Sequence, residues 1–563
     1  MRSGPDELIR PIRFRDSWRN WTRITTVRII VQAVFFGLFV AFVLLTTFKN
    51  LDRWPALRFW LNKFLEIDPL IALATAITTH SVYDGLLWSL LIVIPTLFLG
   101  RFFCGWICPY GTLHQFVRWL LRGPVGSRST SGTRPLAVPG ASAGELAQRD
   151  PNRYRASQQL KYYILVGLLV AAACGGLQIG LLDPLALLYR SLTGAALPAL
   201  HMPPRLVGPE RVYQGAWLIG FLLFGLLAAN LVYPRFFCRV LCPLGALLGV
   251  LARWSWWRIQ RDPQSCTQCD HCRVNCEGAC DPQARLRKAE CFVCFNCLED
   301  CPTGGLRFAS FAAPSGAVAG PDVSRRKLVF AGLSGLIFLP LVRASGRSTR
   351  DFSSRVIRPP GAVEELEFLR RCIKCGQCMR VCPTNVLQPD WFASGLEGLW
   401  TPVLNFRMGH CQLHCTACGE VCPTGAIERI GVARKLGQGE FGETGPVRLG
   451  TAHIDPARCL PHSKNVPCVV CEEVCPTSPK AIYGQTVTRP SRDGRPIELR
   501  LPQVDLEHCI GCGLCEWSCP VVGDRRAVYV TAEGETRSAD QPQPDRNRSV
   551  RLARARLLGL PKS

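Results

Sequence analysis

The stretch Cys372-Ile-Lys-Cys375-Gly-Gln-Cys378-Met-Arg-Val-Cys382-Pro383 has four cysteines at the spacing C-x2-C-x2-C-x3-C, and the last one stands directly before a proline. In chains with this pattern the first three thiolates bind one cubane iron–sulfur cluster, and the fourth usually binds the neighbouring cluster. The chain contains six four-cysteine groups, of which four have this spacing and five end in Cys-Pro. They are Cys266, Cys269, Cys272 and Cys276; Cys291, Cys294, Cys297 and Cys301; Cys372, Cys375, Cys378 and Cys382; Cys411, Cys415, Cys418 and Cys422; Cys459, Cys468, Cys471 and Cys475; and Cys509, Cys512, Cys515 and Cys519. About six [4Fe–4S] clusters, bound in pairs, are therefore expected.

Structural zinc and disulfide bonds are the two alternative uses of clustered cysteines, and each predicts a different pattern. Structural zinc sites use two separated cysteine pairs or mix cysteine with histidine, whereas disulfide scaffolds are small secreted chains. Neither produces closely spaced triplets repeated so often along 563 residues. The spacing therefore favours iron–sulfur ligation.

The fourth cysteine of each group is expected to bind the cluster of the partner group. In the C-terminal half this predicts four sites: Cys372, Cys375 and Cys378 with Cys422; Cys411, Cys415 and Cys418 with Cys382; Cys459, Cys468 and Cys471 with Cys519; and Cys509, Cys512 and Cys515 with Cys475. In the pair nearest the N-terminus, Cys276 has no proline after it, while Cys280 is followed by Asp281-Pro282. Either thiol can be the fourth ligand there, and we favour Cys276.

Apolar residues are concentrated in the first 255 residues, although 19% of the chain is charged. Four runs of 16 to 21 residues carry most of them, at 29–48, 85–100, 162–182 and 216–233. At 1.5 Å per residue, such runs can cross roughly 30 Å of hydrocarbon, and buried core helices are the alternative. The expected fold is an α-helical membrane bundle of four spans, with a possible fifth, plus small α+β ferredoxin-like iron–sulfur modules.

The formal net charge of +24 is distributed unevenly along the chain. The N-terminus, the connection between the second and third runs, and the segment after the fourth run are rich in arginine, whereas the connections 49–84 and 183–215 are less basic and carry acids. By the positive-inside rule the basic segments face the cytoplasm. The charge thus predicts a multi-pass protein of the bacterial inner membrane with a cytoplasmic N-terminus, and no nucleic acid partner.

The apolar region contains an internal duplication. Asp68-Pro-Leu precedes the second run, which ends in Phe-Phe-Cys104-Gly-Trp-Ile-Cys108-Pro, and Asp183-Pro-Leu precedes the fourth run, which ends in Phe-Phe-Cys238-Arg-Val-Leu-Cys242-Pro. The four thiols of these CxxxCP motifs are candidates for one extra redox or metal site. Helix ends broken at proline are the alternative interpretation.

The remaining sequence divides into several expected units. Residues 1–261 form the membrane domain, 262–310 a cytoplasmic two-cluster module, 351–530 a periplasmic four-cluster domain, and 531–563 a disordered tail. The segment 324–344 opens with Ser-Arg-Arg and continues with a short apolar stretch. This pattern is typical of a twin-arginine export signal, here internal, and a fifth membrane helix is the alternative.

A redox partner inside the membrane is also expected. The b-type haems need facing axial histidines within the spans, and no such pair of histidines occurs in the four runs. Quinol remains as the candidate, with Asp68 and Asp183 as residues that accept its protons. Capping of a helix before proline is the commoner function of such aspartates.

The motifs also carry a family resemblance. Residues 25–310, with spans ending in FFCGWICPYG and FFCRVLCPLG followed by two cysteine groups, resemble NapH and the related MauN and NosR proteins. Residues 324–530 resemble NapG and MauM, so the chain looks like a natural NapH–NapG fusion. The resemblance implies a quinol dehydrogenase that passes electrons to a periplasmic redox protein, such as a c-type cytochrome or a reductase.

Two functional hypotheses follow. In the first, the protein oxidises quinol from the membrane pool and sends electrons through [4Fe–4S] clusters to a periplasmic partner in anaerobic respiration. In the second, it is a maturation or reactivation factor that sends cytoplasmic reducing equivalents to a periplasmic metalloenzyme. The module at 266–301 motivates the second hypothesis, because a path from quinol to the periplasm has no evident need for it.

Overall fold

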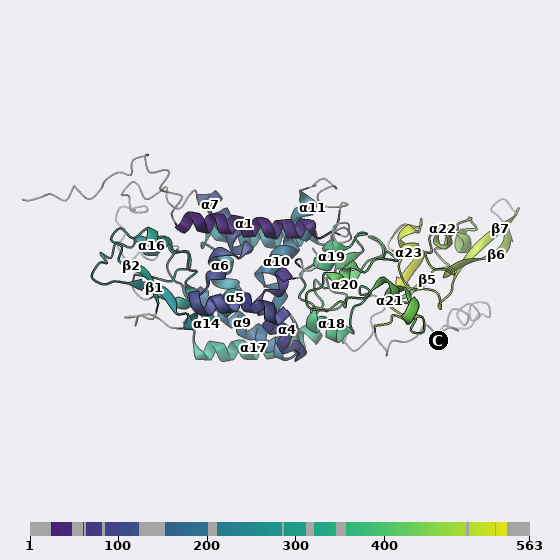
Figure 1. Ribbon diagram of the computed structural model, residues 1–563. Coiled ribbons are helices and arrows are strands. Elements are labelled where there is room, and N and C mark those ends of the chain that lie inside the picture. Colours follow the sequence, from purple (N-terminus) through teal and green to yellow (C-terminus); the bar gives the residue numbers. More distant parts are fainter. Residues whose placement is uncertain are drawn as a thin grey trace, which may run out of the picture.

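The computed structural model describes residues 24–47, 60, 63–81, 85–122, 152–200, 211–283, 286–310, 320–321, 323–344, 356–490, 495–523 and 525–537. The basic N-terminus, most of the arginine-rich connection before residue 152 and the tail beyond residue 537 lie outside this part of the chain. A helical bundle occupies the middle of the molecule, and cysteine-rich modules lie at its two ends (Figure 1).

The bundle is built from two similar halves. Its first half contains α1 (Ile24–Leu45), α4 (Pro69–Thr79), α5 (Gly85–Leu99), α6 (Phe102–Trp106) and α7 (Pro109–Arg122). Its second half contains α9 (Leu160–Ala173), α10 (Pro184–Ser191), α13 (Ala216–Ala228), the π-helical turn η8 (Phe237–Leu241) and α14 (Pro243–Leu251). Short helical segments connect these helices: η4 (Ala156–Gln159), η5 (Ile179–Leu181), η6 (Leu192–Ala196), α11 (Leu197–Ala199), η7 (Ala229–Leu231) and η9 (Ala252–Trp254).

Proline sets the start of the corresponding helices in both halves. Helices α4 and α10 begin at a proline that follows an aspartate cap, and the Asp68 and Asp183 side chains each accept hydrogen bonds from two backbone N–H groups. Helices α7 and α14 begin at the proline of a CxxxCP motif. Proline fits this first position because its missing N–H would have no partner there. The sequence duplication is therefore also a structural duplication.

Four full-length spans are not confirmed. Within the described residues, only α1, with 22 residues, is long and apolar enough to cross a membrane by itself. Helices α5, α9 and α13 have 15, 14 and 13 residues, or roughly 20 Å each at 1.5 Å per residue. The predicted run 162–182 is interrupted because α9 ends before Gly175, whose φ of +87° is not helical. The bundle thus combines one long helix with several shorter ones.

The predicted signal segment forms a helix, α17 (Arg325–Ala344), that lies along α9. The two helices approach closely at glycines: a Cβ atom on Gly335 would lie 2.4 Å from the carbonyl oxygen of Gly167. Near the end of α17, Arg343 forms a 3.0 Å ion pair with Glu397 and donates a hydrogen bond to Gly175. The segment is therefore an integral part of the bundle.

The module before α17 is small. Strands β1 (Trp257–Arg261) and β2 (Leu306–Ser310) form an antiparallel pair in which Ile259 lies opposite Phe308. Between them come η10 (Lys288–Glu290) and two single turns of helix, α15 (His271–Val274) and α16 (Asn296–Glu299). We call residues 257–310 the inner module.

The module after α17, residues 356–537, is larger and rich in loops; we call it the outer module. Its helical segments are α18 (Glu365–Arg371), α19 (Gln377–Val381), α20 (Ala417–Glu420), α21 (Val432–Leu436), η11 (Gly439–Phe441), η12 (Leu460–Lys464), α22 (Val470–Glu473) and α23 (Leu514–Ser518). Its antiparallel strand pairs are β3 (Leu387–Pro389) with β4 (Pro402–Leu404), β5 (Thr451–Ile454) with β8 (Val528–Thr531), and β6 (Ile482–Pro490) with β7 (Pro496–Val504). Such short elements agree with the predicted α+β ferredoxin-like modules.

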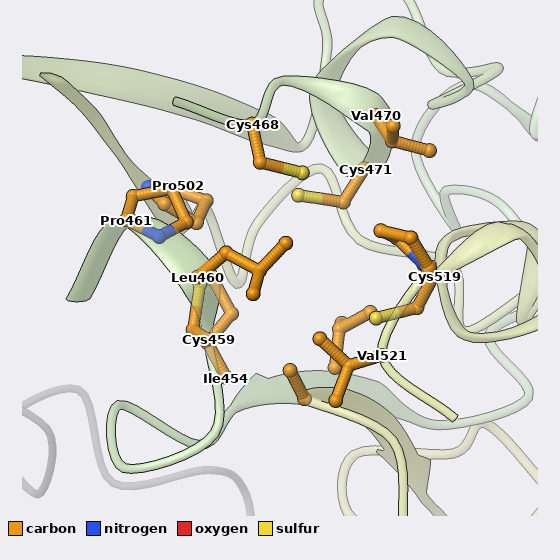
Figure 2. A pocket seen from close by; sticks show the side chains of 13 residues that line it. Ile454, Cys459, Leu460, Pro461, Cys468, Val470, Cys471, Pro502, Cys519 and Val521 are labelled. Atoms are coloured by element: carbon orange, nitrogen blue, oxygen red, sulfur yellow. The ribbon is translucent and has the colours of Figure 1, made fainter. Parts of the chain in front are cut away.

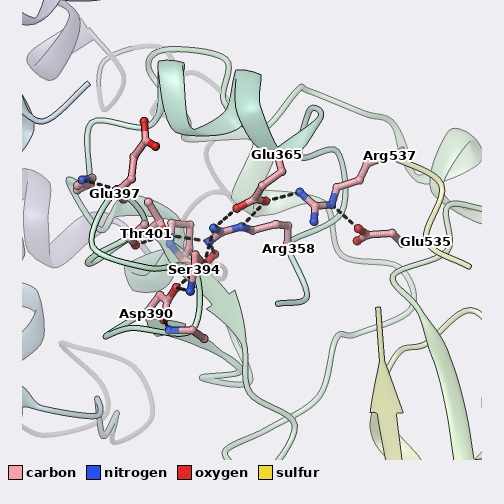
Figure 3. Close-up of polar contacts among 12 residues, drawn as sticks. Arg358, Glu365, Asp390, Ser394, Glu397, Thr401, Glu535 and Arg537 are labelled. Carbon is pink, nitrogen blue, oxygen red and sulfur yellow. Dashed lines mark hydrogen bonds and ion pairs between the residues drawn. The ribbon is translucent and has the colours of Figure 1, made fainter. Parts of the chain in front are cut away.

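The outer module continues past the predicted boundary at residue 530. Arg537 forms ion pairs of 2.6 Å with Glu365 and 2.8 Å with Glu535 (Figure 3). The Thr451 hydroxyl donates to the carbonyl of Glu533. The start of the predicted tail at 531 is therefore too early, because charged residues after β8 find buried partners.

Candidate metal centres

The cavity farthest from the bundle has cysteines from both of the last two groups. Cys459, Cys468, Cys471 and Cys519 line it together with apolar side chains such as Leu460 and Val521, and the sulfur atoms of the first three ligands and of Cys519 surround one space (Figure 2). The cavity has about 380 Å³ of non-atom space, including its opening. This arrangement matches the predicted exchange of the fourth ligand between groups.

A second cavity of about 320 Å³ lies in the same part of the outer module. It is lined by Cys475, Cys509, Cys512 and Cys515, and the backbone N–H of Ala452 donates to the Cys509 sulfur at 3.4 Å. Apolar walls, inward thiols and N–H donors to sulfur suit a cubane, since such hydrogen bonds stabilise the charge on cluster sulfurs. The residues present fit [4Fe–4S] clusters.

The other two groups of the outer module are arranged in the same way. Cys378 interacts electrostatically with Cys375, Cys372 and Cys422, whereas Cys418 interacts with Cys415, Cys411 and Cys382. Burial raises the pKa of both Cys378 and Cys418 well above the ordinary value of a thiol. Metal binding must therefore displace protons from these sites.

Lys435 supports one of these groups directly. Its ammonium group donates to the Cys411 sulfur at 3.3 Å and to the carbonyl oxygens of Gln412 and Cys415 at 2.6 and 2.7 Å. The lysine is only 4% exposed, so its charge acts at low dielectric on the thiolate side of the site. Cysteine spacing alone does not predict the role of Lys435, because no cysteine motif contains this residue.

The inner module contains five thiols around one cavity of about 300 Å³: Cys276, Cys280, Cys291, Cys294 and Cys297. The sulfurs of Cys276 and Cys280 are 3.3 Å apart. A hydrogen bond from Cys280 lowers the pKa of Cys276 to about 7, and the same contact raises that of Cys280. Both candidate fourth ligands therefore line the cavity, and the choice between them stays open.

The second site of the inner module also combines cysteines from both of its sequence groups, because Cys301 lies near Cys272. Cys272 interacts electrostatically with Cys269, Cys266, Cys276 and Cys301, and burial raises the pKa of Cys272 to about 12. Cys269 is exposed, so this site lies at the surface of the inner module.

The cysteine geometry also bears on the zinc and disulfide alternatives. All 30 cysteines lie in the described part of the chain, and none of them is disulfide-bonded. Over the described residues, no group of three or more His, Cys, Asp or Glu side chains is arranged to hold a single metal ion. Zinc needs all its ligands at about 2.0 to 2.3 Å from one ion, whereas the thiolates of a cubane bind four separate irons and stand farther apart. The cavities lined by four thiols from two cysteine groups fit this wider arrangement.

The four CxxxCP cysteines, which we call the thiol quartet, come together inside the bundle. Cys242 interacts electrostatically with Cys238, Cys104 and Cys108, and Cys108 interacts with Cys238 and Cys104. The Cys242 sulfur caps α14 by accepting the N–H of Gly245 at 3.2 Å. Cys108, Cys238 and Cys242 are buried.

Asp68 and Asp183 lie close to each other, a contact that the sequence alone did not predict. Both are fully buried, and each uses its Oδ1 atom to cap a helix. Their side chains are within hydrogen-bonding reach of each other, while both Oδ2 atoms lack another donor. Two carboxylate oxygens can bond only if one carries a proton. A proton on one of the two carboxyl groups would allow them to form a hydrogen bond.

Buried cations around the thiol quartet are the main feature that the sequence did not reveal. Lys161, Arg235 and Arg239 belong to the basic segments predicted to face the cytoplasm, but their side chains are at most 1% exposed. A signal was present in the sequence: each CxxxCP motif is preceded by Arg-Phe-Phe, at Arg101 and at Arg235. A repeated arginine beside a repeated cysteine indicates a shared local function.

Comparisons with known proteins agree with these sites. The family described as 4Fe-4S binding domain matches residues 82–128 and 213–261, a 4Fe-4S dicluster domain matches 371–426, and a further 4Fe-4S binding domain matches 502–522. No solved structure matches the chain. The chain therefore has multiple 4Fe-4S segments in both of its halves.

Curated relatives cover the ferredoxin part. The ferredoxin-type protein NapG of Escherichia coli is 32% identical over 206 residues, which are 36% of this chain and 83% of NapG. The methylamine utilization ferredoxin-type protein MauM of Methylorubrum extorquens is 33% identical over 207 residues, 35% of this chain and 84% of MauM. Protein NirI of Paracoccus denitrificans is 31% identical over 242 residues, 41% of this chain and 30% of NirI. This chain thus belongs to the NapG and MauM family of ferredoxin-type proteins, and is an iron–sulfur electron-transfer protein.

Proposed function

We propose that the protein is a membrane-bound quinol dehydrogenase component that passes electrons through about six [4Fe–4S] clusters to a periplasmic redox partner. The observation that carries this proposal is the position of α1 between the two modules. Near its start, Arg28 donates to the carbonyl of Cys294 in the inner module at 3.0 Å, and near its end Arg380 of the outer module donates to the carbonyl of Val43 at 3.2 Å. Twenty-two residues extend about 33 Å, close to the roughly 30 Å of a bilayer core.

The surface of the bundle supports a membrane location. Large apolar side chains are exposed on α1, α5, α13 and α17, including Trp217, Phe221 and Phe224 at 76, 70 and 70% exposure. An apolar surface of this extent is unfavourable in water. Helix α17 runs beside α9, with Ser324 near Tyr163 at one end and Arg343 near Gly175 at the other. These contacts along α9 favour a retained fifth helix over a cleaved signal.

The positive-inside rule orients this bundle with the inner module in the cytoplasm and the outer module in the periplasm. When bound, the clusters supply one-electron relay chemistry. The chain's own residues hold the thiolates, cover them with apolar walls and keep successive sites within single small modules. The site formed by Cys459, Cys468, Cys471 and Cys519 lies farthest from the bundle (Figure 1). Electrons would leave there, to a c-type cytochrome or a reductase.

Quinol oxidation releases two electrons and two protons, so the site needs a proton acceptor. We assign this role to Asp68 and Asp183, which lie on the outer side of the bundle. The pair would hold one proton between its two carboxylates, pass it to water, and then accept the second. Arg190, whose guanidinium donates to the carbonyl of Lys374 at 3.2 Å, interacts electrostatically with Asp183 and with Cys375. The carboxyl pair is thus next to the first cysteines of the outer module.

The experiment is quinol oxidation by purified, anaerobically prepared protein in detergent or proteoliposomes. A menaquinol analogue should reduce the clusters, with bleaching of their visible absorption, and oxidised c-type cytochrome should restore the absorption. Clusters that dithionite reduces but quinol does not would contradict the proposal.

Asp68→Asn separates proton acceptance from helix capping, because asparagine caps helices about as well as aspartate but accepts no proton. We expect quinol oxidation to fall at least about 10-fold, while reduction by dithionite is unchanged. Asp455→Asn is the matched control and should retain the activity, because Asp455 also caps backbone, accepting the N–H of Ala457 at 3.0 Å. Equal loss in both variants would remove Asp68 from the mechanism.

The maturation hypothesis remains a second candidate because the inner module is built into the bundle rather than tethered to it. Glu277 of that module forms ion pairs of 3.0 Å with Arg28 and 2.7 Å with Arg235. If cytoplasmic electrons reach a periplasmic client, the double variant Cys291→Ala and Cys294→Ala should abolish activation of the client but leave quinol-dependent reduction of the outer module. Full activation by the variant would eliminate this candidate.

A further inference from the structure

The thiol quartet is formed from two halves of the chain that meet at one place. Each half contributes two thiols, Cys104 and Cys108 from one and Cys238 and Cys242 from the other. Arg235, from the second half, donates to the carbonyl of Cys104 at 3.1 Å, and a Cβ atom on Gly245 would lie 2.7 Å from the Arg101 side chain and 3.4 Å from the Cys242 sulfur. The thiols of the two halves also interact electrostatically with one another. The matched segments 82–128 and 213–261 each contain one CxxxCP motif, so only the two together provide four ligands.

The N-termini of α7 and α14 stabilise negative charge on the sulfur atoms of the thiol quartet. Helices α7 and α14, with 14 and 9 residues, both start at the proline after a quartet cysteine. Cys242 accepts the backbone N–H of Gly245, and Cys108 accepts those of Gly111 and Tyr110. Helix N-termini carry partial positive charge, and ordinary caps are Ser, Thr, Asp or Asn rather than Cys. Two thiol caps in one buried place therefore suggest metal ligands.

The charges around the quartet provide a second, independent observation. Arg101, Lys161 and Arg235 are at most 1% exposed, and all three interact electrostatically with Cys238. Glu290 pairs with Arg101 at 3.6 Å and with Lys161, while Glu277 pairs with Arg28 and Arg235. Two carboxylates are thus shared among four cations, which leaves an excess of buried positive charge, and such an excess is costly. Thiolates that bind a metal cluster would supply the missing negative charge.

The quartet also lies between the two modules. On the inner side, Arg101 donates to the carbonyl of Ala289 at 2.9 Å and Trp106 to that of Val293 at 2.9 Å, in the loop that carries Cys291 and Cys294. On the outer side, one continuous apolar core contains Cys108, Tyr110, Cys242, Ile373 and Cys375.

We propose that Cys104, Cys108, Cys238 and Cys242 together bind one additional iron–sulfur cluster, which connects the inner and outer modules across the bundle. The metal site follows from the ligands and charges alone, whereas its relay function rests on the proposed function. In each transfer the donor cluster of one module loses one electron and the quartet centre gains it, then passes it to the other module. No bond to a substrate forms and no proton moves.

The first test is iron and acid-labile sulfide per chain in anaerobic, fully reconstituted protein, together with Mössbauer spectra. Six cubanes account for about 24 irons, so the proposal predicts 26 to 28 and one further spectral component. A wild-type protein with complete cubanes and only about 24 irons would overturn it, without any variant being needed.

The second test compares the double variant Cys104→Ser and Cys238→Ser with Cys174→Ser, an exposed cysteine at the end of α9 in the same bundle. The double variant should lose two to four irons and the additional component, and keep the signals of the other six clusters; Cys174→Ser should match the wild type. An unchanged spectrum in the double variant would also overturn the proposal.

A third measurement addresses the relay function. In proteoliposomes, a membrane-impermeant reductant added on the side of the outer module should reduce the inner-module clusters in the wild type but at least 10-fold more slowly in the double variant. Quinol oxidation is measured separately, so a protein that lacks quinol activity but has the additional iron would contradict the proposed function and not this site.

Discussion

At the scale of single residues, Arg358 and Glu365 illustrate how the outer module is held together without a large apolar core. The Arg358 guanidinium is 1% exposed and donates to Glu365, to the hydroxyls of Ser394 and Thr401, and to the carbonyl of Pro402 (Figure 3). Burial by itself would raise the pKa of Glu365, but Arg358 and Arg537 outweigh it and lower the pKa to about 2. The Glu365 carboxylate therefore connects α18 to the loop that carries Arg358 and to the C-terminal segment that carries Arg537.

We predict that Glu365→Gln lowers the free energy of unfolding of the outer module by about 3 kcal/mol at pH 7, because it leaves buried Arg358 without its counterion. Since the folded pKa lies below the unfolded one, the contribution of Glu365 is complete above about pH 4.5 and is lost as the pH falls towards 2. Denaturant titrations between pH 7 and 3.5 check this.

Glu498→Gln, on an exposed position of β7, is the control and should change stability little. A Glu365→Gln protein as stable as the wild type at pH 7, or a difference that grows on acidification, would show that the ion pair does not have this role.

At the scale of secondary structure elements, glycine at the α9–α17 contact decides whether α17 can lie in the bundle. A Cβ atom at Gly335 would come within 2.4 Å of the Gly167 carbonyl, whereas one at Gly332, on the same helix, meets nothing within 4 Å. Gly335→Ala should therefore cost about 2 kcal/mol and loosen α17, while Gly332→Ala should be neutral or slightly stabilising through helix propensity.

Thermal unfolding and protease sensitivity after residue 344 measure both effects. The same response in both variants would mean that close packing of α17 against α9 does not contribute to stability. The pair is informative because the two substitutions are chemically identical and lie one helical turn apart.

Features that depend on local sequence could be predicted, whereas contacts between distant parts of the chain could not. Cysteine spacing is a local signal, and the fourth-ligand exchange it implied agrees with the cavities around Cys519 and Cys475. Apolar length is also local, and it located α1, α5 and α13 to within a few residues. In the run 162–182, however, the chain leaves the helix before Gly175, so α9 is shorter than predicted. The approach of Asp68 to Asp183, or of Lys435 to Cys411, depends on distant parts of the chain and has no local signal.

At the scale of the whole molecule, contacts at the two ends of α1 predict opposite sides of the membrane for the two modules. A fluorescent protein inserted after Ser310, at the end of β2, should fluoresce, and alkaline phosphatase fused after Arg537 should be active, because each reporter works on only one side. We expect both signals in intact cells.

Exchanged reporters serve as the control and should both be silent. Phosphatase activity after Ser310 would place the inner module outside and would invert the proposed orientation, while leaving the assignment of the cysteine sites untouched.

In the proposed membrane location, the hydrogen bonds that join the two ends of α1 to the modules, from Arg28 to Cys294 and from Arg380 to Val43, would also determine how the protein responds to its lipids. A single-pass anchor adapts to a thicker or thinner membrane by tilting. Here tilting of α1 would break its attachment to one module or the other, so hydrophobic mismatch must be absorbed by the acyl chains. The protein should thus compress or stretch the surrounding lipid, and the distance between its two outermost redox sites should stay constant from one membrane to another.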